Sequence, residues 1–281
     1  MRILVIGDFH GKFPEKLKKI AKKVDIIVSL GDYTPFTLRK EFFKYCYGKD
    51  VELWEAVGKS RYKKVITNDF KKGENILKKL NELSVPVVSV LGNIDYPLAD
   101  DVNDIKRIKG KKSWKWDEDR TKYLQRAIKK YKNIQYIDYN AFIFRGIVFI
   151  GARGHSHPGR VKSSGFRKHK KILDKLFYKY RKKKIIFVSH VVPNNTKLDK
   201  IRDKKAHKWA RGKHFGSKLM RRIVDKWHPI LNLSGHFHEN IGEDRLGKTL
   251  IVNPGAAVEG KAAIIDFNEE KGKINKIKFI K

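Results

Sequence analysis

The stretch Ile3-Leu4-Val5-Ile6-Gly7-Asp8-Phe9-His10 begins with four apolar residues and ends in a carboxylate and an imidazole close together. A short apolar run rich in β-branched residues predicts a buried β-strand. The polar residues follow the strand at the point where it leaves the sheet, which is the edge at which α/β proteins bind their ligands. The stretch therefore predicts an α/β fold and places a functional site at the end of its first strand.

Short apolar runs of the same kind recur along the chain, at 26–31, 87–92, 147–151, 185–190 and 230–236. Several of them alternate with stretches of helical periodicity, so we expect an α/β layered domain with largely buried strands. After Gly247 the runs TLIVNPG, AAIIDF and INKIKFI are joined by short turns. This spacing predicts a β-rich C-terminal part that packs onto the main sheet.

Two segments are longer than simple connections between strands require. Residues 33–82 predict two or three helices, and residues 97–135 contain the helical stretch RTKYLQRAIKKYK. We expect a single domain over residues 1–281, with helical insertions at about 33–82 and 97–135. Each insertion could cap a site or simply cover the sheet.

The charge of the chain is strongly unbalanced, with 65 Lys and Arg against 30 Asp and Glu, a formal net charge of +35. Hydrophobic residues make up 41% of the chain, which is enough for a packed core and excludes general disorder. A charge of this size attracts polyanions, so nucleic acid is one expected partner. The alternative is a thermophile-like, lysine-rich surface, although such surfaces usually mix both signs of charge.

The single cysteine, Cys46, excludes an internal disulfide. No apolar run reaches the length of a membrane span, and the N-terminal stretch reads as a strand and not as a secretion signal. We therefore expect a cytoplasmic protein without membrane contact. No feature of the sequence indicates the oligomeric state.

Polar side chains follow five of the predicted strands, each next to a glycine or a serine. They are Asp8 and His10, then Asp32, then Asn93 and Asp95, then His190, and finally His236 and His238. Carboxylate, amide and imidazole donors suit divalent transition metals, and the absence of paired cysteines argues against a structural zinc site. In an extended loop, residues two apart point to the same side, so the DxH and HxH pairs can converge on metal ions.

In chain order these blocks read DxH, GD, GN, a lone His and GHxH, and this order resembles the calcineurin-like metallophosphoesterase superfamily from Asp8 to about Gly255. The blocks GNID, HxxPNNTKLD, HFGS, GHFHENxG and VNPG resemble its archaeal branch of predicted phosphoesterases, which is related to cyclic-nucleotide phosphodiesterases. The resemblance implies a layered β-sandwich flanked by helices. It also implies two divalent metal ions, for which we expect manganese, with iron, zinc, nickel or cobalt as alternatives.

The resemblance also implies the ligands of each ion. One ion is held by Asp8, His10, Asp32 and His238, and the other by Asp32, Asn93, His190 and His236, so that Asp32 bridges them. A hydroxide held between the two ions would then hydrolyse a phosphate ester without a covalent enzyme intermediate. The residues expected to take part in catalysis are Asp32, Asn93, His190, Asp95 and His214.

One position departs from the pattern of the superfamily. Many members have a histidine directly after the asparagine of the GN block, where this chain has Ile94. The proton for the leaving group must then come from another side chain or from metal-bound water, or the leaving group must be one that departs without a proton. The candidate side chains are His155, His157 and His214. Asp95 could instead orient a metal ligand or cap the following turn.

The substrate class stays open at this level. Basic stretches at 162–184 and 197–222 flank His190 and favour a phosphodiesterase that acts on nucleotides or nucleic acid. The aromatic residues within KILDKLFYKY share one helical face, which is typical of core and not of base stacking. The alternatives are a small-molecule phosphomonoesterase or cyclic-nucleotide phosphodiesterase, and a non-catalytic scaffold that binds nucleic acid or protein.

Overall fold

The computed structural model describes residues 1–95, 114–154, 161, 164–202, 206 and 208–281. Its helical elements are α1 (Glu15–Ala21), α2 (Arg39–Glu41), a π-helical turn η1 (Phe42–Cys46), α3 (Leu53–Val57), α4 (Lys59–Asn81), α6 (Lys115–Arg120), α7 (Tyr123–Ile128), α8 (Ser164–Lys179), α9 (Lys218–Trp227) and a 3₁₀ turn η2 (Ala257–Glu259). None of the helices in these ranges has the length and apolar character needed to cross a membrane.

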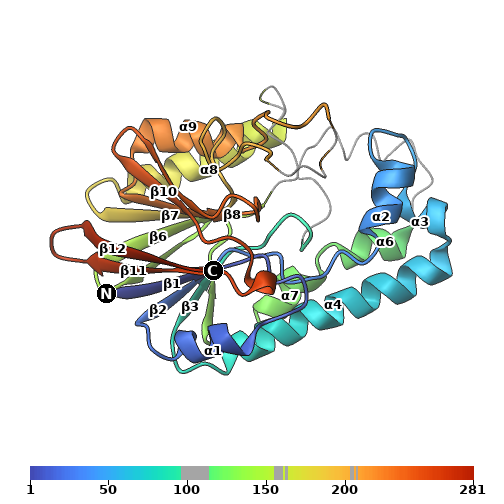
Figure 1. Cartoon of the computed structure of the whole chain (residues 1–281), viewed down its shortest axis with the longest axis horizontal. Helices are drawn as coiled ribbons and strands as arrows, with labels where there is room; N and C mark the ends of the chain where they lie inside the picture. The colour runs from blue at the N-terminus through green and yellow to red at the C-terminus, as the bar shows by residue number, and fades with distance from the viewer. Residues whose placement is uncertain (96–113, 155–160, 162–163, 203–205, 207) are drawn as a thin grey trace.

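The strands form two six-stranded sheets that lie face to face (Figure 1). The first sheet has the order β12-β11-β1-β2-β3-β4, built from β12 (Lys273–Ile280), β11 (Ala262–Asn268), β1 (Arg2–Ile6), β2 (Ile26–Ser29), β3 (Val87–Ser89) and β4 (Ile134–Tyr136). The second has the order β5-β6-β7-β8-β10-β9, built from β5 (Ala141–Phe144), β6 (Ile147–Ala152), β7 (Lys184–Val191), β8 (Leu231–Gly235), β10 (Thr249–Asn253) and β9 (Gly242–Leu246).

The alternation of side chains along the strands divides the core into three layers. In β1, Ile3 and Val5 face the second sheet, whereas Leu4 and Ile6 face the helices of the first sheet. Helices α1, α4 and α7 pack on this outer face, and α8 and α9 pack on the outer face of the second sheet (Figure 1). The predicted layered β-sandwich flanked by helices is confirmed.

The predicted insertion at 33–82 contains α2, η1, α3 and α4. Its long helix α4 buries one face, including Ile66, Phe70 and Leu77, against the first sheet. In Figure 1, α2, α3 and α6 extend beyond the strand ends. Of the second predicted insertion, residues 97–113 lie outside the described residues, and the remainder forms α6, α7 and the start of β4.

The sheet topology brings the polar strand ends together. Strands β1, β2 and β3 run parallel to one another, and so do β6, β7 and β8, so the carboxyl ends within each set share an edge. A hydrogen bond joins the two sheets at this edge, where the backbone amide of His236 donates to Oδ2 of the Asp8 side chain at 3.0 Å. The predicted site therefore lies across both sheets.

Candidate metal centre

Two groups of metal-ligating side chains converge at this edge. The first cluster consists of Asp8, His10 and His238, and the second cluster consists of Asp32, His190 and His236. Within each cluster the potential ligand atoms lie within 4.8 Å of one another. Asn93 adjoins the second cluster, with its Oδ1 2.8 Å from Nε2 of His190. The structure thus brings together all seven residues for which the sequence predicts metal binding.

The backbone at these positions is unusual. Four predicted ligands adopt a left-handed conformation, Asp8, His10, Asp32 and His236, with φ between 45° and 73°. They are half of the eight non-glycine residues with positive φ in the described chain. This conformation costs about 1–2 kcal/mol per residue, and such strain is found mainly at functional sites. The concentration of strained residues supports a functional role for this edge.

The position of Asp32 is fixed by the close approach of two backbone loops. Gly31 has a φ of +87°, and a Cβ at this position would lie 2.1 Å from the backbone nitrogen of Gly92. A Cβ on Gly92 would lie 1.9 Å from Oδ1 of Asp32. That same oxygen accepts a hydrogen bond from the amide of Ile94 at 3.1 Å. The two glycines therefore allow the loops after β2 and β3 to pack against each other.

The geometry around His190 tests whether a cation fits. Its Nδ1 donates to the carbonyl of Leu30 at 2.8 Å, and burial lowers the pKa of the ring, so the ring is neutral and Nε2 carries a lone pair. This lone pair faces the amide oxygen of Asn93 at 2.8 Å and Oδ2 of Asp32 at 3.5 Å. Three electron-rich atoms that converge in this way repel one another unless a cation lies among them. The second cluster therefore fits a divalent metal ion.

The first cluster has the same character. Nε2 of His10 and Nε2 of His238 face each other at 3.1 Å, and Nε2 of His238 lies 3.2 Å from Oδ1 of Asp8. Burial raises the pKa of Asp8, but its interaction with His238 outweighs this effect, so that the pKa falls below its usual range. Two imidazoles beside an ionised carboxylate are typical nitrogen and oxygen ligands of transition metals.

The pKa values predict how metal binding depends on pH. Burial raises the pKa of Asp32 to about 7, whereas burial lowers that of His236 to about 3. Below pH 7 the Asp32 carboxyl therefore holds a proton that an ion must displace, while His236 is already neutral. Burial lowers the pKa of His238, but its hydrogen bond to Asp8 outweighs this effect and raises the pKa above its usual value, so His238 also gains a proton as the pH falls. We therefore expect proton release on binding Mn²⁺ to rise by more than about one per chain between pH 8 and pH 6.

Isothermal titration calorimetry in buffers of different ionisation enthalpy measures this release. The matched variant is Asp32→Asn, in which the added release at pH 6 should be smaller than in the wild type. Equal release at pH 6 and pH 8 in the wild-type protein would contradict the assignment of Asp32 as a ligand.

Asp95 lies behind the ligands. Its side chain is fully buried, and Oδ1 accepts from the amides of Tyr33 and Thr34 at 2.8 and 3.1 Å, while Oδ2 accepts from the amide of Gly92 at 3.0 Å. It therefore ties the loop that carries Asp32 to the loop that carries Asn93. This placement matches the predicted alternative in which Asp95 orients a metal ligand.

The candidates for proton donation have different positions. His155 and His157 lie outside the described residues. His214 is partly exposed, and its Nδ1 lies 2.7 Å from Oδ1 of Asp199, which is fully buried. Asp199 also accepts from the amides of Asn195, Thr196 and Gly216. Asp199 is the last residue of the block HxxPNNTKLD, but a single carboxylate after the turn-forming stretch PNNT indicates no specific role in the sequence alone.

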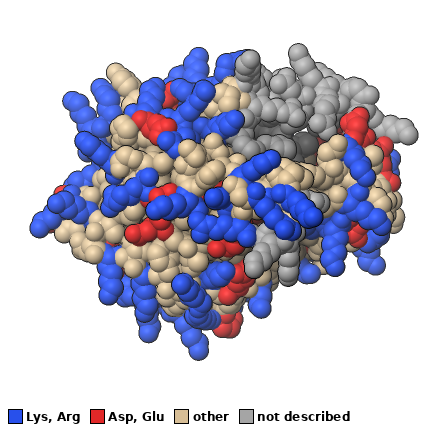
Figure 2. Space-filling view, turned by 45° about the horizontal axis from the view of Figure 1, so that its top comes forward, with Lys and Arg blue, Asp and Glu red and all other residues tan. Residues whose placement is uncertain are grey.

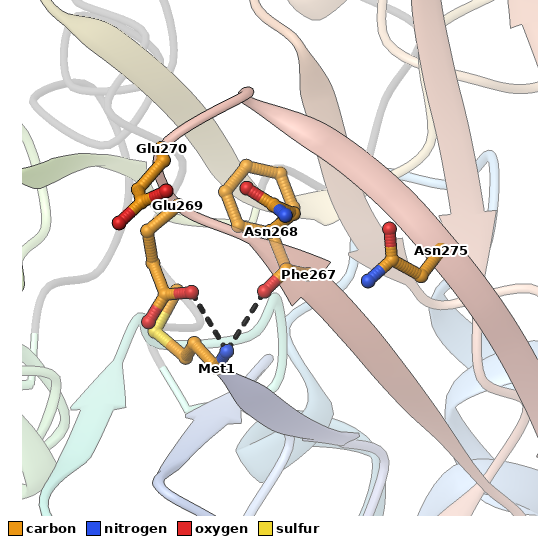
Figure 3. A pocket seen from close by; sticks show the side chains of 6 residues that line it. All are labelled: Met1, Phe267, Asn268, Glu269, Glu270 and Asn275. Atoms are coloured by element: carbon orange, nitrogen blue, oxygen red, sulfur yellow. Dashed lines mark hydrogen bonds and ion pairs between the residues drawn. The ribbon is translucent and has the colours of Figure 1, made fainter.

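A cavity of about 370 Å³ lies beside the N-terminal residue Met1 (Figure 3). It is lined by Met1, Phe267, Asn268, Glu269, Glu270 and Asn275. The N-terminal amine donates to the carbonyl of Phe267 and to Oε2 of Glu269, both at 2.8 Å. None of the predicted site residues lines this cavity, and two of its polar groups hold the amine of Met1 beside β11.

These features define an α/β sandwich with a candidate dinuclear metal centre at the carboxyl ends of its parallel strands. Residues 1–240 match the calcineurin-like phosphoesterase family, and the chain belongs to that family of metal-dependent phosphoesterases. The predicted resemblance is therefore confirmed. The family uses two divalent ions, in agreement with the two clusters.

The individual relatives have low sequence identity to this chain. The chain is 27% identical over 261 residues to the uncharacterized protein MJ1162 of the archaeon Methanocaldococcus jannaschii, a match that covers 90% of this chain and 88% of the relative. The crystal structure of TT1561 of Thermus thermophilus superposes with a TM-score of 0.55 at 16% identity, covering 99% of this chain and 97% of the other. Another crystal structure reaches a TM-score of 0.66 at 20% identity, covering 99% and 98%. The two structures share the fold of this chain.

Proposed function

We propose that this chain is a phosphodiesterase that hydrolyses a phosphodiester bond in a nucleotide or nucleic acid. The observation that carries the proposal is the convergence of two clusters of metal ligands, contributed by both sheets, on one edge of the sandwich. The excess of Lys and Arg supports a polyanionic substrate. In Figure 2, Lys and Arg cover much of the face shown, with few acidic residues between them.

The proposed ligand sets follow the two clusters. Asp8, His10 and His238 would hold one ion and Asn93, His190 and His236 would hold the other, with Asp32 placed to serve both. Two divalent ions at this position would lower the pKa of a bound water and offset the charge on the phosphate oxygens. The nitrogen and oxygen donors suit Mn²⁺, and Fe, Zn, Ni and Co compete for the same ligands. Asp95 is proposed as a positioning residue for Asp32 and Asn93.

The protein groups around the ions have separate tasks. The hydrogen bond from Nδ1 of His190 to Leu30 holds the ring with Nε2 toward the site. The hydrogen bond from Ile94 to Asp32 holds that carboxylate in its orientation. Because Ile94 itself offers no proton, we assign proton donation to His214, whose Nδ1 is held by Asp199, so that Nε2 is the nitrogen through which a proton would be transferred.

A comparison of leaving groups tests His214. The variant His214→Ala is expected to lower kcat/KM about 100-fold or more for a diester that releases an alkoxide, because that leaving group needs a proton. The loss should be much smaller for a nitrophenyl diester, whose leaving group departs without one. His228→Asn, a change at an exposed histidine, is the control. Equal losses for both leaving groups would remove His214 from this role.

The substrate class is tested by one panel of assays with added Mn²⁺. The panel contains bis-(p-nitrophenyl) phosphate, p-nitrophenyl phosphate, cyclic nucleotides and a short RNA, each at low and moderate salt. The proposal predicts faster turnover of the diester than of the monoester, and RNA hydrolysis that weakens as salt rises. Preference for the monoester would indicate a phosphatase, and no turnover of any substrate would indicate a binding scaffold.

A further inference from the structure

The insertion after Asp32 exposes an unusual number of aromatic side chains. Seven large hydrophobic residues of the described chain are exposed, and five of them belong to one region: Phe43, Tyr45, Tyr47, Val51 and Trp209. Trp209 is 49% exposed and comes from the distant segment between β7 and α9. Exposed apolar side chains that gather in this way usually mark a binding surface.

The rings form a continuous row that joins the segment after Asp32 to the segment around His214. Phe36 contacts Phe42 at 5.6 Å between ring centroids, and Phe43 contacts Tyr47 at 5.2 Å. Tyr47 lies nearly parallel to Trp209 at 6.4 Å, and Trp209 contacts Phe215 at 5.7 Å. We call these six residues the aromatic row: Phe36, Phe42, Phe43, Tyr47, Trp209 and Phe215.

Both ends of the aromatic row are close to the proposed catalytic residues along the chain. Phe36 follows Asp32 by four residues, which limits their separation to about 14 Å. Phe215 directly follows His214, the proposed proton donor. A ligand on the aromatic row therefore lies within a few nucleotide lengths of the metal centre.

Cationic side chains lie near both parts of the aromatic row. The guanidinium of Arg39 lies 5.3 Å from the ring centroid of Phe43, and Nζ of Lys44 lies 4.9 Å from that of the neighbouring Tyr45. Beside Trp209, the side chains of Lys208, Arg211 and Lys213 are exposed. Positive charge beside partly exposed aromatic rings is the pattern by which proteins bind single-stranded nucleic acid, with phosphates on the cations and bases on the rings.

We propose that the aromatic row is a base-stacking platform that holds a single strand of nucleic acid as it enters the metal centre. A duplex fits this surface less well, because its bases are already stacked within the helix. A second copy of the chain is disfavoured by the mutual repulsion of two molecules with a net charge of +35. This inference extends the proposed function. It rests on that function only for the hydrolysis of the bound strand, and not for its binding.

Binding is measured by fluorescence anisotropy with a labelled 12-nucleotide single strand of RNA, in the presence of EDTA so that no metal-dependent step contributes. Trp209→Ala and Tyr47→Ala are each expected to weaken binding about 5- to 150-fold, the range expected for the loss of one stacked base. Trp209→Phe should restore most of the affinity. The control is Tyr178→Ala, since Tyr178 on α8 is 58% exposed and has Arg181 4.0 Å from its ring centroid.

The salt dependence separates stacking from charge. Trp209→Ala should lower the affinity without changing the slope of log Kd against log salt, whereas Lys208→Ala should reduce that slope by about 0.7. A duplex of the same sequence should bind more weakly than the single strand. The inference is wrong if both aromatic variants bind within twofold of the wild type, if Tyr178→Ala loses as much affinity, or if the duplex binds as tightly.

Two further readouts complete the test. Sedimentation of the wild type and of Trp209→Ala shows whether the row joins two chains, and a dimer lost in the variant without weaker RNA binding would overturn the proposal. The hydrolysis panel on the wild type tests the proposed function separately. If RNA binding depends on Trp209 but the protein has no hydrolytic activity, the base-stacking platform is supported and the proposed phosphodiesterase activity is rejected.

Discussion

Asp32→Ala is expected to lower metal-dependent diester hydrolysis by more than about 100-fold. Even the loss of a group that only supports a metal ligand costs about 10–100-fold in metal affinity or activity. Asp32 belongs to the second cluster, and the charges of His10 and Asp8 in the first cluster act on its pKa. The loss of Asp32 should therefore affect both proposed ions. Hydrolysis of bis-(p-nitrophenyl) phosphate at saturating Mn²⁺ measures the effect.

Asp25→Ala is the matched control for this change. Asp25 precedes β2, whereas Asp32 follows it, so the two carboxylates lie beyond opposite ends of the same strand. Asp25 pairs with Arg145 at 3.0 Å on the partly exposed surface, and its loss should leave hydrolysis within about twofold of the wild type. Near-normal activity of Asp32→Ala would remove this residue from the proposed centre.

Gly92→Ala is expected to have a large effect through packing alone. The added Cβ would lie 1.9 Å from Oδ1 and 2.4 Å from the backbone nitrogen of Asp32, and backbone cannot rotate away as a side chain can. We expect a loss of about 3 kcal/mol in the free energy of unfolding, or about 6–12 °C in Tm, together with weaker metal binding. Thermal unfolding and Mn²⁺ titration measure the two effects.

Gly247→Ala provides the comparison for Gly92. Gly247 lies in the turn between β9 and β10, where an added Cβ meets nothing within 4 Å, although its φ of +56° makes alanine unfavourable. This control should lose about 1–2 kcal/mol and keep its affinity for Mn²⁺. If Gly92→Ala were no less stable than Gly247→Ala and bound Mn²⁺ normally, the close packing of the two loops would not be required.

The main architecture could be predicted because its strands are short, apolar and buried. The apolar runs at 26–31, 147–151 and 185–190 all contain observed strands, and the β-rich part after Gly247 forms β10, β11 and β12. The edge strands β5 and β9 were not predicted, because their residues are largely half-exposed. In β9 they are also mostly polar. Three-residue strands such as β4 are too short to show a periodic pattern.

The metal-ligand candidates could be predicted because each stands in a short block beside an apolar strand. Asp199 could not, because its role depends on a long-range hydrogen bond to His214 and on backbone amides of the surrounding loop. The exposure of Phe43, Tyr47 and Trp209 could not be predicted from the sequence either. The run FFKYCY is compatible with a buried helix, and only the folded chain shows that Trp209 stacks beside Tyr47.

Anomalous diffraction from crystals soaked in Mn²⁺ tests the central claim most directly. We predict two anomalous peaks per chain, one among Asp8, His10 and His238 and one among Asn93, His190 and His236, with the Asp32 carboxylate in contact with both. Crystals of Asp32→Ala should show weaker peaks at these positions. No peak at either cluster in the wild-type protein, or manganese bound only at other positions, would contradict the account.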